Sequence, residues 1–253
     1  MGVRMTGGRT FAFAALALGA LAPTAAAQPV LADLSSHVIA ISTDFTGTEV
    51  VLFGALEEPG NVAVVVRGPS ERVVVRQKDR IAGIWINRTS ISFDHVPSYY
   101  GVATNGPIET FADERLLERQ EIGLNHLRMA PVGAEGFTDT QIAEFRDALV
   151  RAKQREGVFP AEAGQVVFLG DRLFRTTVSF PANVPTGQYQ IRVFLIRDGQ
   201  MVHATTTPLI ISKIGVGALV FDFAQRYAAL YGLAAILIAA AAGWLASLVF
   251  RRG

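Results

Sequence analysis

Residues 189–201 read YQIRVFLIRDGQM, and this stretch decides the fold class. Apolar side chains stand at every second position from Tyr189 to Leu195, which is the period of a strand with one buried face. The dipeptide Asp198-Gly199 then separates two apolar runs and supplies the positive φ angles that a tight hairpin turn needs. The stretch therefore predicts two antiparallel strands of a half-buried sheet.

Comparable runs of apolar and β-branched residues fill two longer regions of the chain. Residues 28–106 form an N-terminal β region, and residues 158–213 form a C-terminal β region. Short runs alternate with turn-rich stretches in both regions, and Gly68-Pro69, between two copies of VVVR, predicts a hairpin. This pattern is typical of an immunoglobulin-like β-sandwich, present once or twice. The expected fold class is mainly β.

A helical insertion is predicted between the two β regions, at residues 107–157. Its first half is charged and carries leucines at near-helical spacing. In the second half, Thr138 and Gln141 have the spacing of a capping box at a helix start. Phe145 and Leu149 belong to one apolar stripe, so the helix should pack on the β body. We therefore expect two helices, whose charged faces are solvated.

The C-terminal residues 227–250 carry no charge and predict a single transmembrane helix. A helix of 24 residues is about 36 Å long, which exceeds the ~30 Å hydrocarbon layer of a bilayer. Aromatic residues prefer the two interfaces, and basic residues next to a span remain in the cytoplasm. The expected membrane-anchor residues are Tyr227, Tyr231, Trp244, Arg251 and Arg252.

The N-terminal residues 1–27 are interpreted as a signal peptide. Arg4 and Arg9 precede an apolar run at residues 11–22, and the small residues 25–27 suit a signal peptidase. An uncleaved signal anchor is the alternative, because no charge occurs between Thr10 and Ala32.

The two ends together predict a topology. The protein should cross the inner (cytoplasmic) membrane once, with its N-terminal ectodomain in the periplasm and its C-terminus in the cytoplasm. Residues 214–226 would be a juxtamembrane connector, and residues 251–253 a cytoplasmic tail.

Composition excludes several kinds of chemistry. The chain has no cysteine, which rules out disulfides, thiolate metal sites and a cysteine nucleophile. Its formal net charge is +1, and removing the four arginines of the two ends leaves −3 for the middle. Nucleic acid is therefore not an expected partner, since binding phosphates requires a basic surface.

Motifs of catalysis or metal binding are not found in the sequence. The four histidines lack metal-ligand spacing, and no phosphate-binding loop or nucleophile elbow occurs. Asp94-His95 is the one place where a carboxylate residue and a histidine are adjacent, and a surface pair is its simpler interpretation. We expect no catalytic residue, no metal site and no cofactor, and hence no enzyme.

One aromatic group is a candidate partner surface. Trp85, Tyr99 and Tyr100 lie near a proline and a glycine, and such residues are enriched where proteins bind one another. The alternative is that Trp85 and Phe93 are core residues while the tyrosines cover one end of the sandwich.

Three stretches carry a resemblance to a known family. They are LSSHVIAISTDFTGTEVVLFGAL (34–56), DRIAGIWIN (79–87) and FPANVPTGQYQIRVFLIRDG (180–199), followed by the terminal span with its basic residues. In this order they resemble a family of alphaproteobacterial transmembrane proteins, over nearly the whole mature chain. Members of that family are often encoded beside permeases of the sulfite-exporter type, so the resemblance implies a periplasmic accessory to a transporter. The resemblance implies no catalytic residue in this sequence.

Three functions compete at this stage. The first is a non-enzymatic accessory or assembly subunit, whose partners are the lipid bilayer and an integral-membrane protein such as an anion permease. The second is a membrane-tethered ligand-binding module or enzyme, with Asp94, His95 and the nearby tyrosines in one pocket. The third is an envelope scaffold that self-associates through the helix face bearing Gly232 and Gly243.

Overall fold

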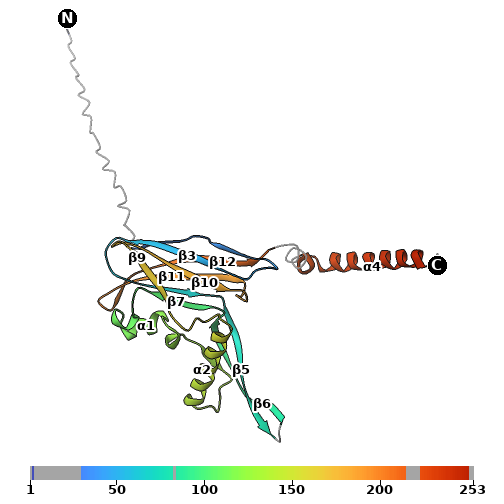
Figure 1. Ribbon diagram of the computed structural model, residues 1–253, viewed down its shortest axis with the longest axis horizontal. Coiled ribbons are helices and arrows are strands. Elements are labelled where there is room, and N and C mark those ends of the chain that lie inside the picture. Colours follow the sequence, from blue (N-terminus) through green and yellow to red (C-terminus); the bar gives the residue numbers. More distant parts are fainter. Residues whose placement is uncertain (1, 3–29, 82–83, 215–222, 251–253) are drawn as a thin grey trace.

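A computed structural model describes residues 2, 30–81, 84–214 and 223–250 (Figure 1). Apart from residue 2, the expected signal peptide lies outside these residues, as do most of the expected connector and the tail with Arg251 and Arg252. The described residues are mainly in strands, which confirms the predicted fold class.

The elements follow one another as two groups of strands with helices between them. The strands are β1 (Val30–Leu34), β2 (Val38–Ile41), β3 (Gly47–Leu56), β4 (Asn61–Arg67), β5 (Ser70–Ile81), β6 (Ile84–Pro97), β7 (Tyr100–Thr104), β8 (Ala130–Val132), β9 (Gly164–Leu169), β10 (Leu173–Pro181), β11 (Gly187–Arg197) and β12 (Gln200–Lys213). The helices are α1 (Glu114–Gln120), α2 (Asp139–Arg155) and α4 (Ala228–Phe250), with short 3₁₀ turns η1 (Ile108–Thr110) and η2 (Leu124–His126).

One curled nine-stranded sheet contains strands of both β regions. Its order is β1-β3-β10-β9-β7-β4-β11-β12-β2. The two ends of the sheet approach each other, since the Thr207 hydroxyl on β12, the strand next to β2, lies 3.4 Å from the Ala32 carbonyl oxygen on β1. The β body is therefore one unit rather than two, and its folded-over sheet is compatible with an immunoglobulin-like sandwich.

The core lies between the two layers of this curled sheet. Strand β10 alternates strictly, with Phe174, Val178 and Phe180 buried and their neighbours exposed. Strand β4 is instead buried along residues 62–66, as a central strand covered on both faces must be. The helical insertion contributes to the same core through residues of α1 such as Leu117.

The predicted Asp-Gly hairpin is confirmed. Strands β11 and β12 are antiparallel, and Arg197 pairs with Gln200 across the two turn residues. Asp198 and Gly199 both have positive φ angles, 48° and 77°, which is the conformation that this dipeptide favours.

The predicted hairpin at Gly68-Pro69 is wrong. Strand β4 continues into β5, and β6 continues into β7, as one long two-stranded ribbon. The amide of Gly68 donates to the Tyr99 carbonyl, and the amide of Ser98 donates to the Pro69 carbonyl, each at 2.8 Å. Gly68 permits this close approach, because a Cβ there would lie 2.6 Å from the Ser98 hydroxyl oxygen.

Strands β5 and β6, which we call the projecting ribbon, extend beyond the β body (Figure 1). Ile81 pairs with Ile84, so the chain reverses after Ile81 rather than at Gly68. Strand β8 joins the ribbon only near its base, at residues 92–94 of β6. The ribbon is therefore anchored at one end and projects at the other.

The two-helix insertion is confirmed. Helix α2 begins at the predicted capping box, in which the Thr138 side chain accepts from the Gln141 amide and the Gln141 side chain accepts from the Thr138 amide. Phe145 and Leu149 are buried, as their spacing predicts. The Lys153 ammonium lies 2.5 Å from the Glu71 carboxylate, so α2 is fixed to the base of the projecting ribbon.

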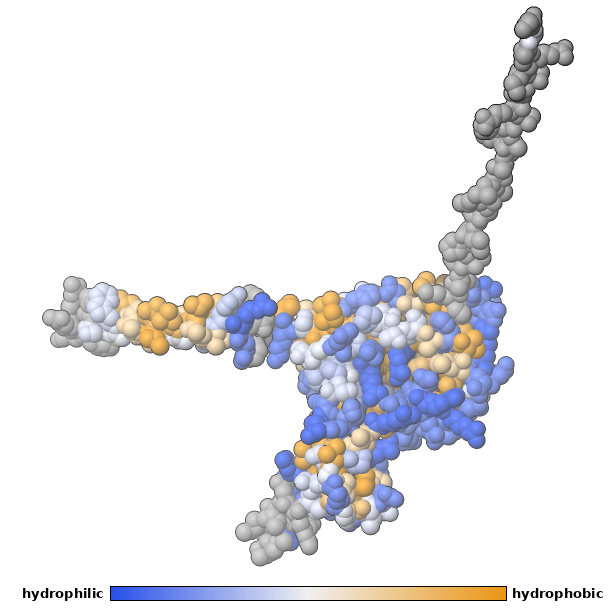
Figure 2. Space-filling model, turned by 180° about the vertical axis from the view of Figure 1, so that it is seen from behind, coloured by the Kyte–Doolittle hydropathy of each residue, from blue (hydrophilic) through white to orange (hydrophobic). Residues whose placement is uncertain are grey.

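Helix α4 confirms the predicted apolar helix. Its 23 residues are about 35 Å long, and no part of the described chain covers the window at residues 228–247. Tyr231 and Trp244 are 44% and 66% exposed, and Tyr227, 50% exposed, stands one residue before the helix. Figure 2 shows apolar side chains along this helix and a mostly hydrophilic β body.

Candidate functional site

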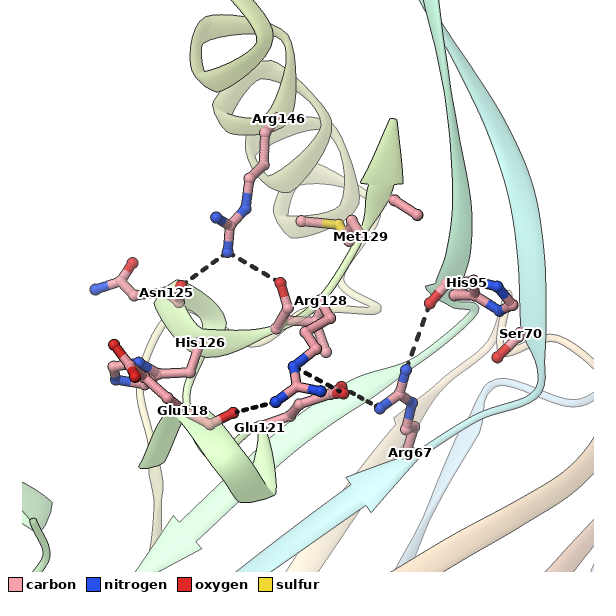
Figure 3. A pocket seen from close by; sticks show the side chains of 12 residues that line it. Arg67, Ser70, His95, Glu118, Glu121, Asn125, His126, Arg128, Met129 and Arg146 are labelled. Carbon is pink, nitrogen blue, oxygen red and sulfur yellow. Dashed lines mark hydrogen bonds and ion pairs between the residues drawn. The ribbon is translucent and has the colours of Figure 1, made fainter. Parts of the chain in front are cut away.

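A polar cleft opens where the ribbon leaves the sheet and meets the helical insertion (Figure 3). Its volume is about 810 Å³. The cleft combines the end of β4, the bulge of β6, the end of α1, the turn η2 and one face of α2. Its lining includes Arg67, Ser70, His95, Glu118, Glu121, Asn125, His126, Arg128, Met129 and Arg146.

Glu121 holds two arginines at the centre of the cleft. Its carboxylate forms an ion pair with Arg67 and lies 3.9 Å from the Arg128 guanidinium. Arg67 also donates to the carbonyl of His95 at 3.4 Å, and Arg128 donates to the carbonyl of Glu118 at 3.4 Å. The Glu121 side chain is only 17% exposed, so this carboxylate is held in place from two sides.

Tyr100 fixes the backbone at this corner of the cleft. Its hydroxyl donates to the Glu121 carbonyl at 2.6 Å and accepts from the Gly123 amide at 2.8 Å. The Glu121 backbone is left-handed, with φ 54°, and these bonds support that conformation. Arg192 donates to the neighbouring Gln120 carbonyl at 3.0 Å, and burial followed by the nearby Arg67 lowers the pKa of Arg192.

Arg146 connects α2 to the turn that follows α1. One of its terminal nitrogens donates to the carbonyls of Asn125 and Leu127, at 2.7 and 3.0 Å. Among the described residues, no carboxylate lies within ion-pair distance of this guanidinium. Its positive charge is therefore compensated only by carbonyl dipoles.

The cleft has the chemistry of a weakly cationic binding site. Three guanidinium groups face two carboxylates, those of Glu118 and Glu121, so the formal charge is +1 with neutral histidines. Guanidinium groups bind carboxylates and oxyanions through paired hydrogen bonds. Within the described ranges, no three side chains of histidine, aspartate or glutamate are grouped to hold a metal ion.

Three buried tyrosines make the stability of the β body sensitive to alkaline pH. Burial raises the pKa of Tyr99 and Tyr100 well above the usual value, and it raises the pKa of Tyr189 to about 12. Above pH ~10 the unfolded chain releases these protons while the folded protein keeps them, so unfolding becomes more favourable as pH rises. Each tyrosine contributes a loss of about 1.4 kcal/mol per pH unit until its folded pKa is reached.

Urea unfolding in detergent between pH 8 and 11.5, followed by near-UV circular dichroism, measures this loss. Tyr100→Phe should lower stability at pH 8 by about 1–3 kcal/mol, because two buried backbone groups lose their partner. The substitution should also reduce the loss of stability per pH unit above pH 10. If the free energy of unfolding of the variant falls with pH as steeply as that of the wild type, the pKa of Tyr100 is not raised in the folded protein.

The pocket expected around Asp94, His95 and the tyrosines does not form. Asp94 forms an ion pair with Arg72 on the ribbon, and this hydrogen-bonded arginine lowers the pKa of the carboxyl group. His95 lines the cleft from a bulge with φ 62°. Tyr99 instead donates to the Ser179 carbonyl at 2.9 Å inside the sandwich. These residues therefore do not share a pocket.

The expected aromatic surface is also wrong for its two tyrosines. Tyr99 and Tyr100 are each 1% exposed, and their hydroxyls are bonded to backbone within the core. Their rings pack on aromatic neighbours, Phe180 and Phe159 respectively. Trp85 lies elsewhere, near the distal end of β6 and paired with Arg80 of β5, so the three aromatic residues do not form one surface.

The cleft itself was missed at the sequence level. Arg67 and Glu121 are 54 positions apart, and Arg146 comes from a third segment. Each residue alone looks like an ordinary charged side chain on a solvated face. The course of the ribbon and the packing of α1 bring these residues together. No regular spacing in the sequence indicates that they meet.

Among the described residues, a β body is followed by one apolar helix long enough to cross a bilayer, which is the architecture of a membrane-anchored protein. The chain belongs to the family described as "Putative transmembrane protein (Alph_Pro_TM)", which matches residues 29–252. This confirms the resemblance found in the sequence. No curated protein matches the chain.

Proposed function

We propose that this chain is an accessory subunit of an integral-membrane partner. In this proposal α4 spans the cytoplasmic membrane once, the β body lies in the periplasm, and Arg251 and Arg252 remain in the cytoplasm. The observation that carries it is the uncovered helix α4, which is apolar around its whole circumference. Lipid or another membrane protein must cover such a helix.

One face of α4 is suited to close packing against a partner helix. Gly232 and Gly243 are eleven residues apart, about three helical turns, and therefore lie on the same face. A Cβ at either position would meet nothing within 4 Å in the described chain. Small residues let helices approach closely in a bilayer, which favours a protein partner on this face. An anion permease of the sulfite-exporter type is the proposed partner, as the family resemblance implies.

Affinity purification from the protein's own membranes in mild detergent tests the proposal. The wild-type chain should recover one integral-membrane protein in a constant ratio. Gly232→Leu combined with Gly243→Leu should reduce that recovery at least tenfold, because leucine side chains separate the helices. Ala234→Leu combined with Ala241→Leu places the same leucine side chains on the opposite face and should leave recovery unchanged.

Two outcomes would contradict the accessory role. If the chain is recovered alone from wild-type membranes, it has no stable membrane partner. Recovery of additional copies of this chain, sensitive to the same glycine substitutions, would instead support the scaffold that self-associates through α4.

A second function, a ligand-binding module for small anions, is favoured by the cleft. Three arginines from β4, the segment after α1 and α2 converge there, and Arg146 lacks a carboxylate partner among the described residues. Sulfate or a small carboxylate should raise the melting temperature at constant ionic strength, since a ligand stabilises the state that binds it. Arg128→Gln with Arg146→Gln should abolish this rise, whereas Arg172→Gln with Arg175→Gln, on β10 and the turn before it, should not.

A further inference from the structure

The outward face of four neighbouring strands is unusually apolar. An antiparallel sheet with one face in water normally carries polar residues on that face. Strands β1, β3, β10 and β9 instead carry apolar residues there. The following side chains are 40% to 65% exposed: Leu31, Phe53, Val167, Leu169 and Leu173. We call these residues, together with Ala55, the outer apolar face. Apolar residues that gather on an exposed surface indicate a site of interaction.

The outer apolar face is continuous across the four strands. Leu31 on β1 pairs with Ala55 on β3, Ala55 pairs with Leu173 on β10, and Leu173 pairs with Leu169 on β9. Residues directly opposite each other in antiparallel strands point to the same side of the sheet. These four residues therefore form one apolar row that no charged residue interrupts.

The next row carries one acidic and one basic residue in symmetric positions. Asp33 on β1 and Arg175 on β10 both pair with Phe53, one on each side of β3. The Asp33 side chain is 56% exposed, and its nearest ionic neighbour is the His37 ring at 2.9 Å. Arg175 is exposed, and no carboxylate in the described part of the chain lies within ion-pair distance of it. Opposite charges therefore flank β3 at the same level.

The strands of this face run toward the end of the β body from which the chain continues to α4. Gly47 on β3 pairs with Pro181 on β10. Gly187, which follows the turn after β10, pairs with Ile211 near the end of β12. The Gly47 end of β3 is therefore the end of the body at which β12 finishes, and Figure 1 shows α4 extending from this end. Two copies anchored in one bilayer must both turn this end toward the membrane.

The direction of a two-fold axis decides which residues of two copies meet. An axis parallel to β3 keeps the Gly47 ends of both copies on the same side, whereas an axis across the strands places them at opposite ends. With the parallel axis, Asp33 faces Arg175 of the second copy, and Leu31 faces Leu173 of the second copy. The axis across the strands would instead set like charges against each other. Charge and membrane anchoring thus favour the same arrangement.

We propose that the outer apolar face binds a second copy of this chain and forms a symmetric dimer of β bodies on one membrane. Phe53 and Ala55 lie on the two-fold axis, and ion pairs between Asp33 and Arg175 border the contact on both sides. Sheets that pack face to face lie ~10 Å apart with their strands nearly aligned. An axis parallel to β3 produces this arrangement.

A second copy is favoured over a different protein because the face is complementary to itself. Its acidic and basic residues are related by the same axis that relates the two copies. The two rows cover roughly 250 Å² of sheet at ~4.8 Å between strands and ~3.4 Å per residue, which is less than the ~800 Å² that each partner of a standard interface buries. Helix α4 compensates for the small area, because two copies held in one bilayer meet at high effective concentration. The inference requires the membrane anchor but not the accessory function proposed above.

Chemical crosslinking of the full-length protein in lipid vesicles tests the dimer. The chain has no cysteine, so Ala55→Cys provides a single thiol on the expected axis. A short bis-maleimide should yield about five times more crosslinked dimer with this variant than with Thr206→Cys, which places the thiol at an exposed position on β12. Both samples contain the same amount of protein per lipid, so random collisions contribute equally.

Exchanging the two charges tests the arrangement itself. In the Ala55→Cys background, Asp33→Arg alone and Arg175→Asp alone should each reduce the dimer about fivefold, because like charges then face each other. Asp33→Arg combined with Arg175→Asp restores opposite charges and should restore the dimer. Both positions are exposed, and far-UV circular dichroism checks the folding of each variant.

Equal crosslinking of Ala55→Cys and Thr206→Cys overturns the proposal, and this comparison decides even if a charge variant fails to fold. A double charge variant that dimerises no better than the single ones also overturns it. Gly232→Leu with Gly243→Leu should leave the dimer unchanged, and loss of the dimer there would assign it to α4 instead. The vesicles contain no other protein, so the result is independent of the membrane partner proposed above.

Discussion

Replacing both Leu237 and Ile238 with arginine is expected to release the protein from membranes. These residues lie at the middle of α4, and they are 62% and 70% exposed with nothing in the described chain to cover them. An arginine at the centre of a membrane helix costs about 2.5–3.5 kcal/mol on insertion scales, so the pair costs about 5–7 kcal/mol. The protein should move from the membrane pellet to the supernatant after extraction with alkaline carbonate.

The matched control exchanges the two apolar residues. Leu237→Ile with Ile238→Leu keeps hydrophobicity and volume, and this variant should remain in the pellet with the wild-type protein. If the double arginine variant also stays there, α4 is not the anchor, and the function proposed above would lose its basis.

Tyr189→Ala should cause the largest loss of stability of any single substitution discussed here. Tyr189 is fully buried, its ring lies 5.8 Å from that of Phe180 and 6.0 Å from that of Tyr99, and its hydroxyl donates to the Pro185 carbonyl at 2.6 Å. Replacing a buried aromatic side chain with alanine leaves a cavity and typically costs about 3–5 kcal/mol. Urea unfolding in detergent should record this decrease in the free energy of unfolding.

Tyr189→Phe separates the ring from the hydroxyl. It keeps the aromatic packing and removes one hydrogen bond, so it should cost only about 1 kcal/mol. Equal losses in the two variants would mean that the hydroxyl rather than the ring stabilises this part of the core. A loss below ~1 kcal/mol for Tyr189→Ala would show that the site collapses around the missing ring.

The sequence correctly predicted those elements whose conformation depends on neighbouring residues. The Asp198-Gly199 turn follows from backbone conformations that few residues adopt, and the start of α2 follows from the Thr138 cap. The apolar segment that becomes α4 follows from its length and lack of charge. None of these features depends on residues far away in the sequence.

Features decided by distant partners could not be predicted in this way. Gly68-Pro69 has the composition of a turn, but hydrogen bonds with Ser98 and Tyr99 keep the ribbon continuous. Tyr99 and Tyr100 resemble interface residues in sequence, and only the positions of their backbone acceptors show that they belong to the core. The arginine cleft depends on the same long-range pairing.

The interleaving of strands from the two β regions has a consequence for how the protein is made. Ser179 pairs with Glu49, 130 positions earlier, so β3 has only β1 as a neighbour until β10 has been synthesised. Folds dominated by such distant pairings close slowly and leave strand edges open in the meantime. The β body can therefore be completed only when nearly all of its chain has emerged, and α4 follows directly afterwards. Folding and membrane anchoring are thus late events of biosynthesis that occur close together in time.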